Sequence, residues 1–372
     1  MKRLYYVDAL RGFAAVLVLT FHTWSEPHPR PQILGPLQPV VANFTSGVIL
    51  FFLVSAFSLC YTMPHHERSG RRLTSFFVHR AFRILPLYYS VLAYAWLSGS
   101  QFADGLSVRQ WLEALTLTYN LDPANIYGFV PAGWTLSVEL LFYLAFPFLI
   151  LSVRTIGRTV TWIAGSVLVW LLTLQIVPQI GLTPDQQAAS AALSVVRLTT
   201  VLLVGILIYR VVTVLDARQL QDGTKRDVGD ALTASAVLLL LCQFSGWIPS
   251  VAGNSSLIIA LCYAVLFVGL ALHPTRLLVN RVTCYLGTIS YSVYLIHPWV
   301  VYRLDPAYAR IQSLSSVGTL TFLGCVALTL VITAMLASIS YMLIERPGIA
   351  LGRRLIRRLT QPASKLPDQD AE

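Results

Sequence analysis

Ten apolar segments, most of them close to twenty residues long, follow one another along the chain. About twenty helical residues at 1.5 Å each cross the ~30 Å of hydrocarbon in a membrane, so each segment predicts a membrane-spanning helix. We therefore expect an all-α fold, a polytopic integral membrane helix bundle with about ten transmembrane helices. The predicted spans are residues 10–25, 44–63, 84–98, 134–152, 159–177, 191–212, 231–247, 255–272, 284–302 and 317–343.

The basic residues indicate how these spans are oriented. With an even number of spans both ends of the chain lie on one side, and that side collects 22 of the 27 Lys and Arg residues, against five on the other. Connections on the cytoplasmic side of a membrane carry such an excess, so both termini are predicted to be cytoplasmic. Orientation also explains the formal net charge of +10, and we expect no nucleic-acid partner.

Composition narrows the class of protein further. Hydrophobic residues make up 56% of the 372 positions and charged residues only 12%, which excludes a soluble globular protein because such domains carry ~25% charged residues. The five cysteines all fall inside apolar segments, without the spacing of a disulfide framework or a zinc site. We interpret them as small buried hydrophobic residues and expect no metal.

Two predicted outer connections and the end of the chain have features of their own. Residues 26–43 contain five prolines, which favour a stiff, extended cover. Residues 99–133 contain Ser107, a typical N-cap residue, followed by apolar residues at helical spacing, which indicates a helix on the outer membrane surface. Residues 348–372 are basic and then polar, and we expect a short interfacial helix that contacts membrane lipid, followed by a disordered end.

The first predicted helix carries three ionisable residues inside or beside the membrane. Such groups cost several kcal/mol at that depth unless they are paired or hydrated, so each is a functional candidate. His22 lies about 20° from Arg11 around the helix and about 16 Å farther toward the outside, so both point into one lumen. Asp8 lies three residues before Arg11 and can pair with it. An interfacial anchor pair and a structural histidine are the alternative interpretations.

Two further ionisable residues, Glu139 and His297, lie at a depth similar to that of His22. One polar pocket shared by all three is the simplest way to satisfy them. A histidine beside a carboxylate can act as a general base toward a hydroxyl or as a transient acyl acceptor. Two histidines and a glutamate are also possible zinc ligands, which is the competing interpretation.

Arg80 and Arg83 lie three residues apart at the cytoplasmic start of the third predicted helix. This spacing places both guanidinium groups on one helix face, where they can bind one phosphate or two adjacent ones. The general excess of basic residues on the cytoplasmic side is the alternative explanation for the pair.

Six motifs, in order along the chain, resemble those of one protein family. They are Asp8-Ala-Leu-Arg11-Gly12 with His22, the segment from Gly47 to Phe57, Arg80-Ala-Phe-Arg83-Ile-Leu-Pro86, Gly133-Trp134-Thr-Leu-Ser137-Val-Glu139 with Phe142, Tyr143 and Pro147, Leu286-Gly287 with Ser290, Tyr291, Tyr294 and His297, and Glu345-Arg346-Pro347. The chain resembles the membrane-bound acyltransferase family 3, which acylates hydroxyls of bacterial surface glycans and of some secreted small molecules. Ile49 stands where many members have an acidic residue and Ala56 where many have glycine, so a role of that acidic residue does not carry over.

The resemblance implies a donor and a set of site residues. Acyl-CoA, most simply acetyl-CoA, would be a donor substrate that approaches from the cytoplasm, and no cofactor would be bound permanently. The implied catalytic residues are His22, Glu139 and Arg11, the acyl-CoA-binding residues are Arg80 and Arg83, and the residues that support the pocket are Asp8, Trp134, Ser137, Tyr143, Tyr291 and His297.

The resemblance also implies an activity and a location. Residues 1–347 would form a transmembrane acyltransferase domain in the bacterial cytoplasmic (inner) membrane, and residues 348–372 a cytoplasmic tail. The acceptor would be a hydroxyl of an extracytoplasmic polysaccharide, such as exopolysaccharide or lipopolysaccharide O-antigen. Acylation of a periplasmic glucan or a small secreted molecule stays open, as does a glycan or lipid-linked-sugar transporter that makes no bond. Direct transfer and an acyl-enzyme intermediate both fit the same residues.

Overall fold

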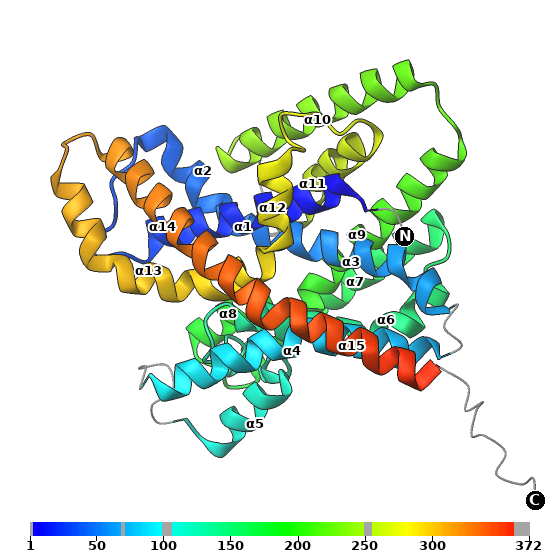
Figure 1. The fold of residues 1–372 in the computed structure, drawn as a ribbon, viewed down its shortest axis with the longest axis horizontal. Coiled ribbons are helices and arrows are strands. Elements are labelled where there is room, and N and C mark those ends of the chain that lie inside the picture. Colours follow the sequence, from blue (N-terminus) through cyan, green and yellow to red (C-terminus); the bar gives the residue numbers. More distant parts are fainter. Residues whose placement is uncertain (1–2, 68–70, 99–105, 249–254, 361–372) are drawn as a thin grey trace, which may run out of the picture.

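The structure, a computed structural model, describes residues 3–67, 71–98, 106–248 and 255–360. These residues form helices joined by short turns and contain no strand, which confirms the predicted all-α fold (Figure 1). The α-helices are α1 (Tyr5–Ser25), α2 (Gln38–Ala42), α3 (Gly47–Glu67), α4 (Arg72–Leu97), α5 (Val108–Thr116), α6 (Gly133–Ser152), α7 (Ile156–Ile176), α8 (Pro184–Leu193), α9 (Val195–Ala217), α10 (Asp222–Phe244), α11 (Ser255–Leu272), α12 (Arg281–Thr288), α13 (Ser290–Ser313), α14 (Gly318–Ser340) and α15 (Arg346–Thr360). The 3-10 turns are η1 (Gly35–Leu37), η2 (Asn43–Ser46), η3 (Tyr119–Leu121) and η4 (Val177–Gln179), and η5 (Tyr341–Glu345) is a π-helical turn.

Each of the ten predicted spans lies on helix, and in the described part of the chain six helical segments are long and apolar enough to cross a membrane. Helices α1, α4 and α13 are not among these six. They carry most of the ionisable candidates of the sequence, and charged or polar side chains lower the mean hydropathy of a span. The six segments are Gly35–Glu67, Gly133–Ser152, Ile156–Gln179, Pro184–Ala217, Asp222–Phe244 and Gly318–Leu359.

Helix α1 lies in the middle of the bundle, in contact with α3, α12, α13 and α14. Two glycines allow its backbone to touch that of α12. A Cβ atom on Gly12 would lie 2.4 Å from the carbonyl oxygen of Thr283, and one on Gly287 would lie 1.7 Å from the carbonyl oxygen of Asp8. These glycines are therefore needed for the close approach that places α1 against the start of α13.

The predicted span over residues 284–302 is wrong in one respect, because the helix is interrupted at Ile289. The residues before the interruption belong to α12, whose start is fixed by Asn280. The Asn280 side chain accepts hydrogen bonds from the backbone N–H groups of Val282 and Thr283. Apolar residues lie on both sides of the interruption, so the prediction joined them into one span, although Gly287, Thr288 and Ser290 flank Ile289.

Helices α14 and α15 form one long helical rod through η5, drawn from orange to red across Figure 1. The α15 part packs against α4, because Gly348 and Gly352 leave room for Phe82. A Cβ atom on Gly348 would lie 2.9 Å from the carbonyl oxygen of Phe82. Of the predicted tail, the residues up to Thr360 are thus helical, and residues 361–372 lie outside the described part of the chain.

The first predicted outer connection is extended only in part. Residues 26–34 are not helical, whereas residues 35–46 form η1, α2 and η2. Two of the five prolines, Pro36 and Pro39, lie in the first turns of η1 and α2, where no backbone N–H donor is required. In the second connection the predicted helix is confirmed as α5, and the Ser107 side chain accepts a hydrogen bond from the Gln110 backbone N–H as its N-cap. Residues 99–105 lie outside the described residues.

We expect Gly287→Ala to destabilise the bundle, because the new methyl group would overlap the backbone of α1. Overpacking of this kind costs about 1–3 kcal/mol. The thermal unfolding midpoint of the detergent-solubilised protein should fall, as measured by loss of the monodisperse peak in size-exclusion chromatography. The matched control is Gly165→Ala in α7, where nothing lies within 4 Å of the Cβ position, and its midpoint should be unchanged or higher. Equal midpoints for the two variants would contradict the close packing.

Candidate active site

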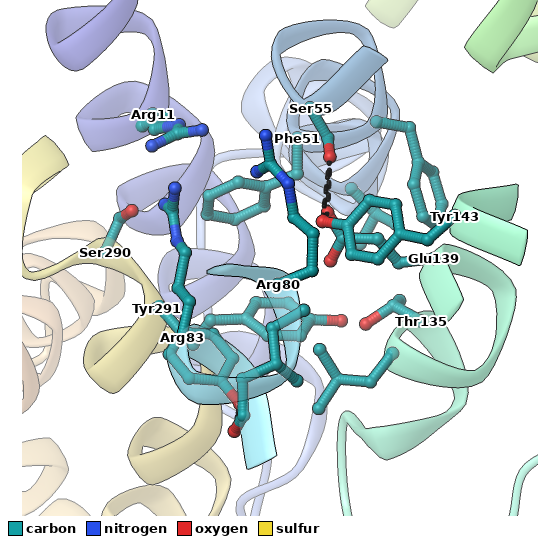
Figure 2. A pocket seen from close by; sticks show the side chains of 15 residues that line it. Arg11, Phe51, Ser55, Arg80, Arg83, Thr135, Glu139, Tyr143, Ser290 and Tyr291 are labelled. Atoms are coloured by element: carbon teal, nitrogen blue, oxygen red, sulfur yellow. Dashed lines mark hydrogen bonds between the residues drawn. The ribbon is translucent and has the colours of Figure 1, made fainter. Parts of the chain in front are cut away.

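A polar cavity of about 80 Å³ lies between α1, α3, α4, α6 and α13 (Figure 2). Arg11 comes from α1, Arg80 and Arg83 from α4, and Glu139 from α6. The spacing of Arg80 and Arg83 does place both on the face of α4 that borders this cavity, as the sequence predicted. Figure 2 shows the guanidinium groups of all three arginines pointing into the same space. We call this space the arginine cavity.

Hydroxyl groups hold the carboxylate of Glu139. It accepts hydrogen bonds from Ser55 on α3 and from Tyr143, one turn further along α6. It forms no ion pair with any arginine in the described residues. The sequence analysis did not predict Ser55 as a site residue. Its hydroxyl in the middle of an apolar segment was the feature that could have indicated it.

Arg80 is fixed between α3 and α6. Its side chain is buried, and its guanidinium donates a hydrogen bond to Thr62 Oγ1 at 3.1 Å. The same group lies over the ring of Tyr143, 5.5 Å from the ring centre, a distance at which a cation and an aromatic face attract each other. Tyr143 therefore contacts both the acidic and the basic side of the cavity.

Arg11 and Arg83 have weaker partners. Arg11 donates one long hydrogen bond, of 3.4 Å, to Ser58, and Arg83 forms no hydrogen bond or ion pair with the described residues. The predicted pairing of Asp8 with Arg11 is wrong, because the Asp8 carboxylate accepts a hydrogen bond from Arg3 Nε at 2.6 Å. The charge of Arg11 is thus left without an acidic partner in contact.

A second carboxylate lies near the same arginines. Glu345 ends the π turn η5, is 3% exposed and accepts a hydrogen bond from the Ser292 hydroxyl. It is close enough to Arg83 and Arg11 for their charges to act on it. The sequence analysis placed Glu345 in a motif but assigned it no role. Three guanidinium groups with two carboxylates leave a net positive charge, so the arginine cavity suits an anionic ligand.

His22 and His297 form a pair. His22 Nδ1 lies 2.9 Å from the carbonyl oxygen of Val18, and His297 Nδ1 lies 3.2 Å from that of Val293. Because a carbonyl oxygen can only accept, each ring carries a proton on Nδ1. His297 Nε2 then accepts a hydrogen bond from His22 Nδ1–H at 3.2 Å, so this N–H is shared between Val18 and His297. The remaining ring nitrogen, His22 Nε2, has no partner in the described residues and keeps a free lone pair.

The histidine pair and Glu139 do not share one pocket, contrary to the prediction. His22 lines a separate cavity of about 1000 Å³, which also includes Trp134 and which we call the His22 cavity. Tyr294 stands between the two. Its ring lines the arginine cavity and has its centre 5.7 Å from that of His297. Serine and tyrosine hydroxyls satisfy Glu139 instead, so the carboxylate needs no histidine.

The other predicted pocket residues have mixed positions. Tyr291 lines the arginine cavity and donates its hydroxyl hydrogen to the carbonyl oxygen of Ile84 at 2.7 Å. Ser137 is fully buried away from it and accepts a hydrogen bond from the backbone N–H of Asn120, which makes it a structural residue. Within the described residues no three His, Cys, Asp or Glu side chains cluster as metal ligands would.

The fold and site together define a membrane-type helix bundle that encloses a positively charged cavity. The family model described as "Acyltransferase domain" matches residues 4–338, so the chain belongs to this family of acyltransferases, as its motifs predicted. Acyltransferase MdmB of Streptomyces mycarofaciens is 27% identical over 394 residues, which cover 98% of this chain and 95% of that protein. Nodulation protein 10 of Rhizobium leguminosarum bv. viciae is 30% identical over 163 residues, 38% of this chain and 43% of that protein. No solved structure matches the chain.

We expect the neutral His22 ring to carry its proton on Nδ1 and not on Nε2, because Nδ1 faces a carbonyl oxygen. Long-range proton–nitrogen correlation spectra of histidine-labelled protein in detergent measure this directly. The exposed ring of His65 is the internal reference, since no backbone carbonyl fixes its tautomer. A His22 signal with the proton on Nε2 would show that this nitrogen is not available as a base.

Proposed function

We propose that the protein is an acyl-CoA-dependent O-acyltransferase, most simply an O-acetyltransferase, that acts on a hydroxyl of an extracytoplasmic polysaccharide. The observation that carries the proposal is the free Nε2 atom of His22, which lines the larger cavity and pairs with His297, whose ring contacts Tyr294 at the edge of the arginine cavity. The positively charged arginine cavity suits the donor, and the larger His22 cavity suits the acceptor. Family membership supplies the reaction class.

In this proposal the phosphates of acyl-CoA bind to Arg80 and Arg83, and Arg11 adds a third positive charge. The excess of basic residues in alternate connections supports a cytoplasmic arginine side, cytoplasmic termini and about ten crossings of the bacterial inner membrane. From Arg11 to His22 helix α1 rises about 16 Å, a distance that the pantetheine arm spans. The thioester then passes the ring of Tyr294 on its way to His22.

The chemistry follows from the free lone pair. His22 Nε2 takes the proton of the acceptor hydroxyl while the hydroxyl oxygen attacks the thioester carbonyl carbon. A C–O bond forms, the C–S bond breaks, and the departing CoA thiolate receives the proton from His22. The Nδ1–H hydrogen bond to Val18, which His297 shares, orients the ring and stabilises the charge that it gains. In an acyl-enzyme route the same lone pair would accept the acyl group.

A transporter that makes no bond is the alternative from another class. Family membership favours bond-making, because the matching family model and a relative aligned over 95% of its length are both named acyltransferases. A periplasmic glucan or a small secreted molecule would be acylated by the same groups, so these acceptors differ from polysaccharide only in what fills the His22 cavity.

His22→Ala should lower acyl transfer at least about 100-fold, because it removes the proposed base. The measurement is transfer of labelled acetyl from acetyl-CoA to polysaccharide in membranes that contain equal amounts of each variant. His65→Ala is the control, since this exposed histidine lies on α3 away from both cavities. Activity of His22→Ala near the wild-type level would remove His22 from the mechanism, and a wild-type protein that moves glycan without transferring label would exclude the enzyme.

Arg83→Ala should raise the KM for acetyl-CoA about tenfold, the loss expected for one charge-assisted contact to a phosphate. Its thermal unfolding midpoint should stay near that of the wild type, because Arg83 bonds to no described residue. Arg80→Ala should raise the KM and also lower the midpoint, because Thr62 and Tyr143 lose their partner. Arg154→Ala, at an exposed position after α6, is the control. An unchanged KM in Arg83→Ala would mean that Arg83 contributes only to the orientation of the protein in the membrane.

A further inference from the structure

An apolar groove of about 450 Å³ runs along the outside of the bundle between α4, α13 and α14. Its walls include Leu87 and Val91 of α4, Val300 of α13 and Leu336 of α14. The groove opens to the surroundings of the protein, and Leu336 is 43% exposed there. No described segment of the chain covers it.

The groove runs lengthwise along the helices. Helices α13 and α14 are antiparallel, and their register is fixed by the hydrogen bond between the Tyr308 and Thr329 hydroxyls at 2.6 Å. Along α14 and η5 the lining residues extend from Ile332 to Ile344. Twelve residues of helix rise about 18 Å, more than half of the ~30 Å hydrocarbon thickness of a bilayer. The shape therefore fits one hydrocarbon chain that lies parallel to the helices.

One end of the groove joins the His22 cavity. Trp299 and Arg303, one helical turn apart on α13, line both spaces. Tyr94 of α4 completes this junction, with its ring centre 5.2 Å from that of Trp299 and its hydroxyl 3.5 Å from the Arg303 guanidinium. A molecule can thus occupy the apolar groove with one part and reach the His22 cavity with another.

The junction carries an unpaired positive charge. Arg303 is exposed and forms no ion pair in the described residues. The acidic residues of the His22 cavity are engaged elsewhere, since Asp305 accepts a hydrogen bond from the backbone N–H of His28 at 3.0 Å and Glu26 accepts one from a neighbouring serine. An anionic group between the apolar chain and the polar part of a ligand would meet Arg303.

We propose that the acceptor is a lipid-linked glycan, whose hydrocarbon chain lies in the groove, whose phosphate binds to Arg303 and whose sugar hydroxyl lies in the His22 cavity. This inference rests on the proposed function and specifies its acceptor. The bond changes are those of the proposed transfer, with a C–O bond formed on the sugar and the C–S bond of acyl-CoA broken. The glycan is acylated while it is still attached to its membrane lipid.

Binding is tested on the full-length protein in nanodiscs with a photoreactive hexadecyl phosphate. Crosslinks should concentrate on the groove-lining parts of α4, α13 and α14. They should fall at least fivefold in Ser90→Trp, which fills the groove from an exposed position, and in Arg303→Glu, which repels phosphate. The controls are Leu323→Trp, exposed on α14 outside the groove, and Arg310→Glu on α13. Crosslinks spread evenly over the apolar surface, or unchanged in Arg303→Glu, would overturn the proposal.

Activity is tested in membranes with labelled acetyl-CoA. The label should appear in product that organic solvent extracts, and Ser90→Trp and Arg303→Glu should each lower it at least tenfold relative to their controls. Label only in water-soluble product, formed equally well by Ser90→Trp, would overturn the lipid-linked acceptor and leave the proposed function intact. No transfer by the wild type would overturn the proposed function and with it the role of the groove in acceptor binding.

Discussion

The cost of placing charged groups in hydrocarbon governs how this bundle is arranged. The α7 span faces outward with only 11% of it buried, whereas the apolar spans Gly35–Glu67 and Pro184–Ala217 are 61% and 56% buried. Helices α1 and α4 supply the three arginines and α6 supplies Glu139, and these helices meet with α3 and α13 around the arginine cavity, inside the bundle. The glycine contacts between α1 and α12 serve the same purpose, because they allow α1, which carries charged residues, to lie in the middle of the bundle.

The way in which Glu139 is satisfied decides what the arginine cavity can do. The net charge of the cavity is the same whether this carboxylate binds to Arg80 or to hydroxyls, but an ion pair would occupy N–H donors of Arg80. Hydroxyls of Ser55 and Tyr143 satisfy the carboxylate and leave those donors available to another anion. Arg83, which has no partner, and Arg11, which has one long hydrogen bond, therefore keep most of their capacity for a phosphate.

The sequence contained the helices and most of the site, but not the contacts between distant segments. Helix is found in each of the ten predicted segments, and helical spacing correctly placed Arg80 and Arg83 on one face. Of the two partners of Glu139, Tyr143 lies one turn along the same helix, whereas Ser55 depends on how α3 packs against α6, which no spacing within one segment reveals. The π turn that positions Glu345 was hidden because residues 317–343 are apolar on all sides, so no polar face shows the shift that one extra residue in a turn produces.

The structure has two cavities where the sequence predicted one pocket. This division has a chemical consequence for the proposed reaction. A thioester is exposed to hydrolysis wherever water reaches it, and the acceptor side must be open to a large ligand. Tyr294, with Phe51 packed against it at a ring-centre distance of 5.4 Å, separates the donor space from that open side. In the proposed reaction the thioester meets the open cavity only at His22, the base. The wall formed by Tyr294 and Phe51 therefore also protects the donor from water.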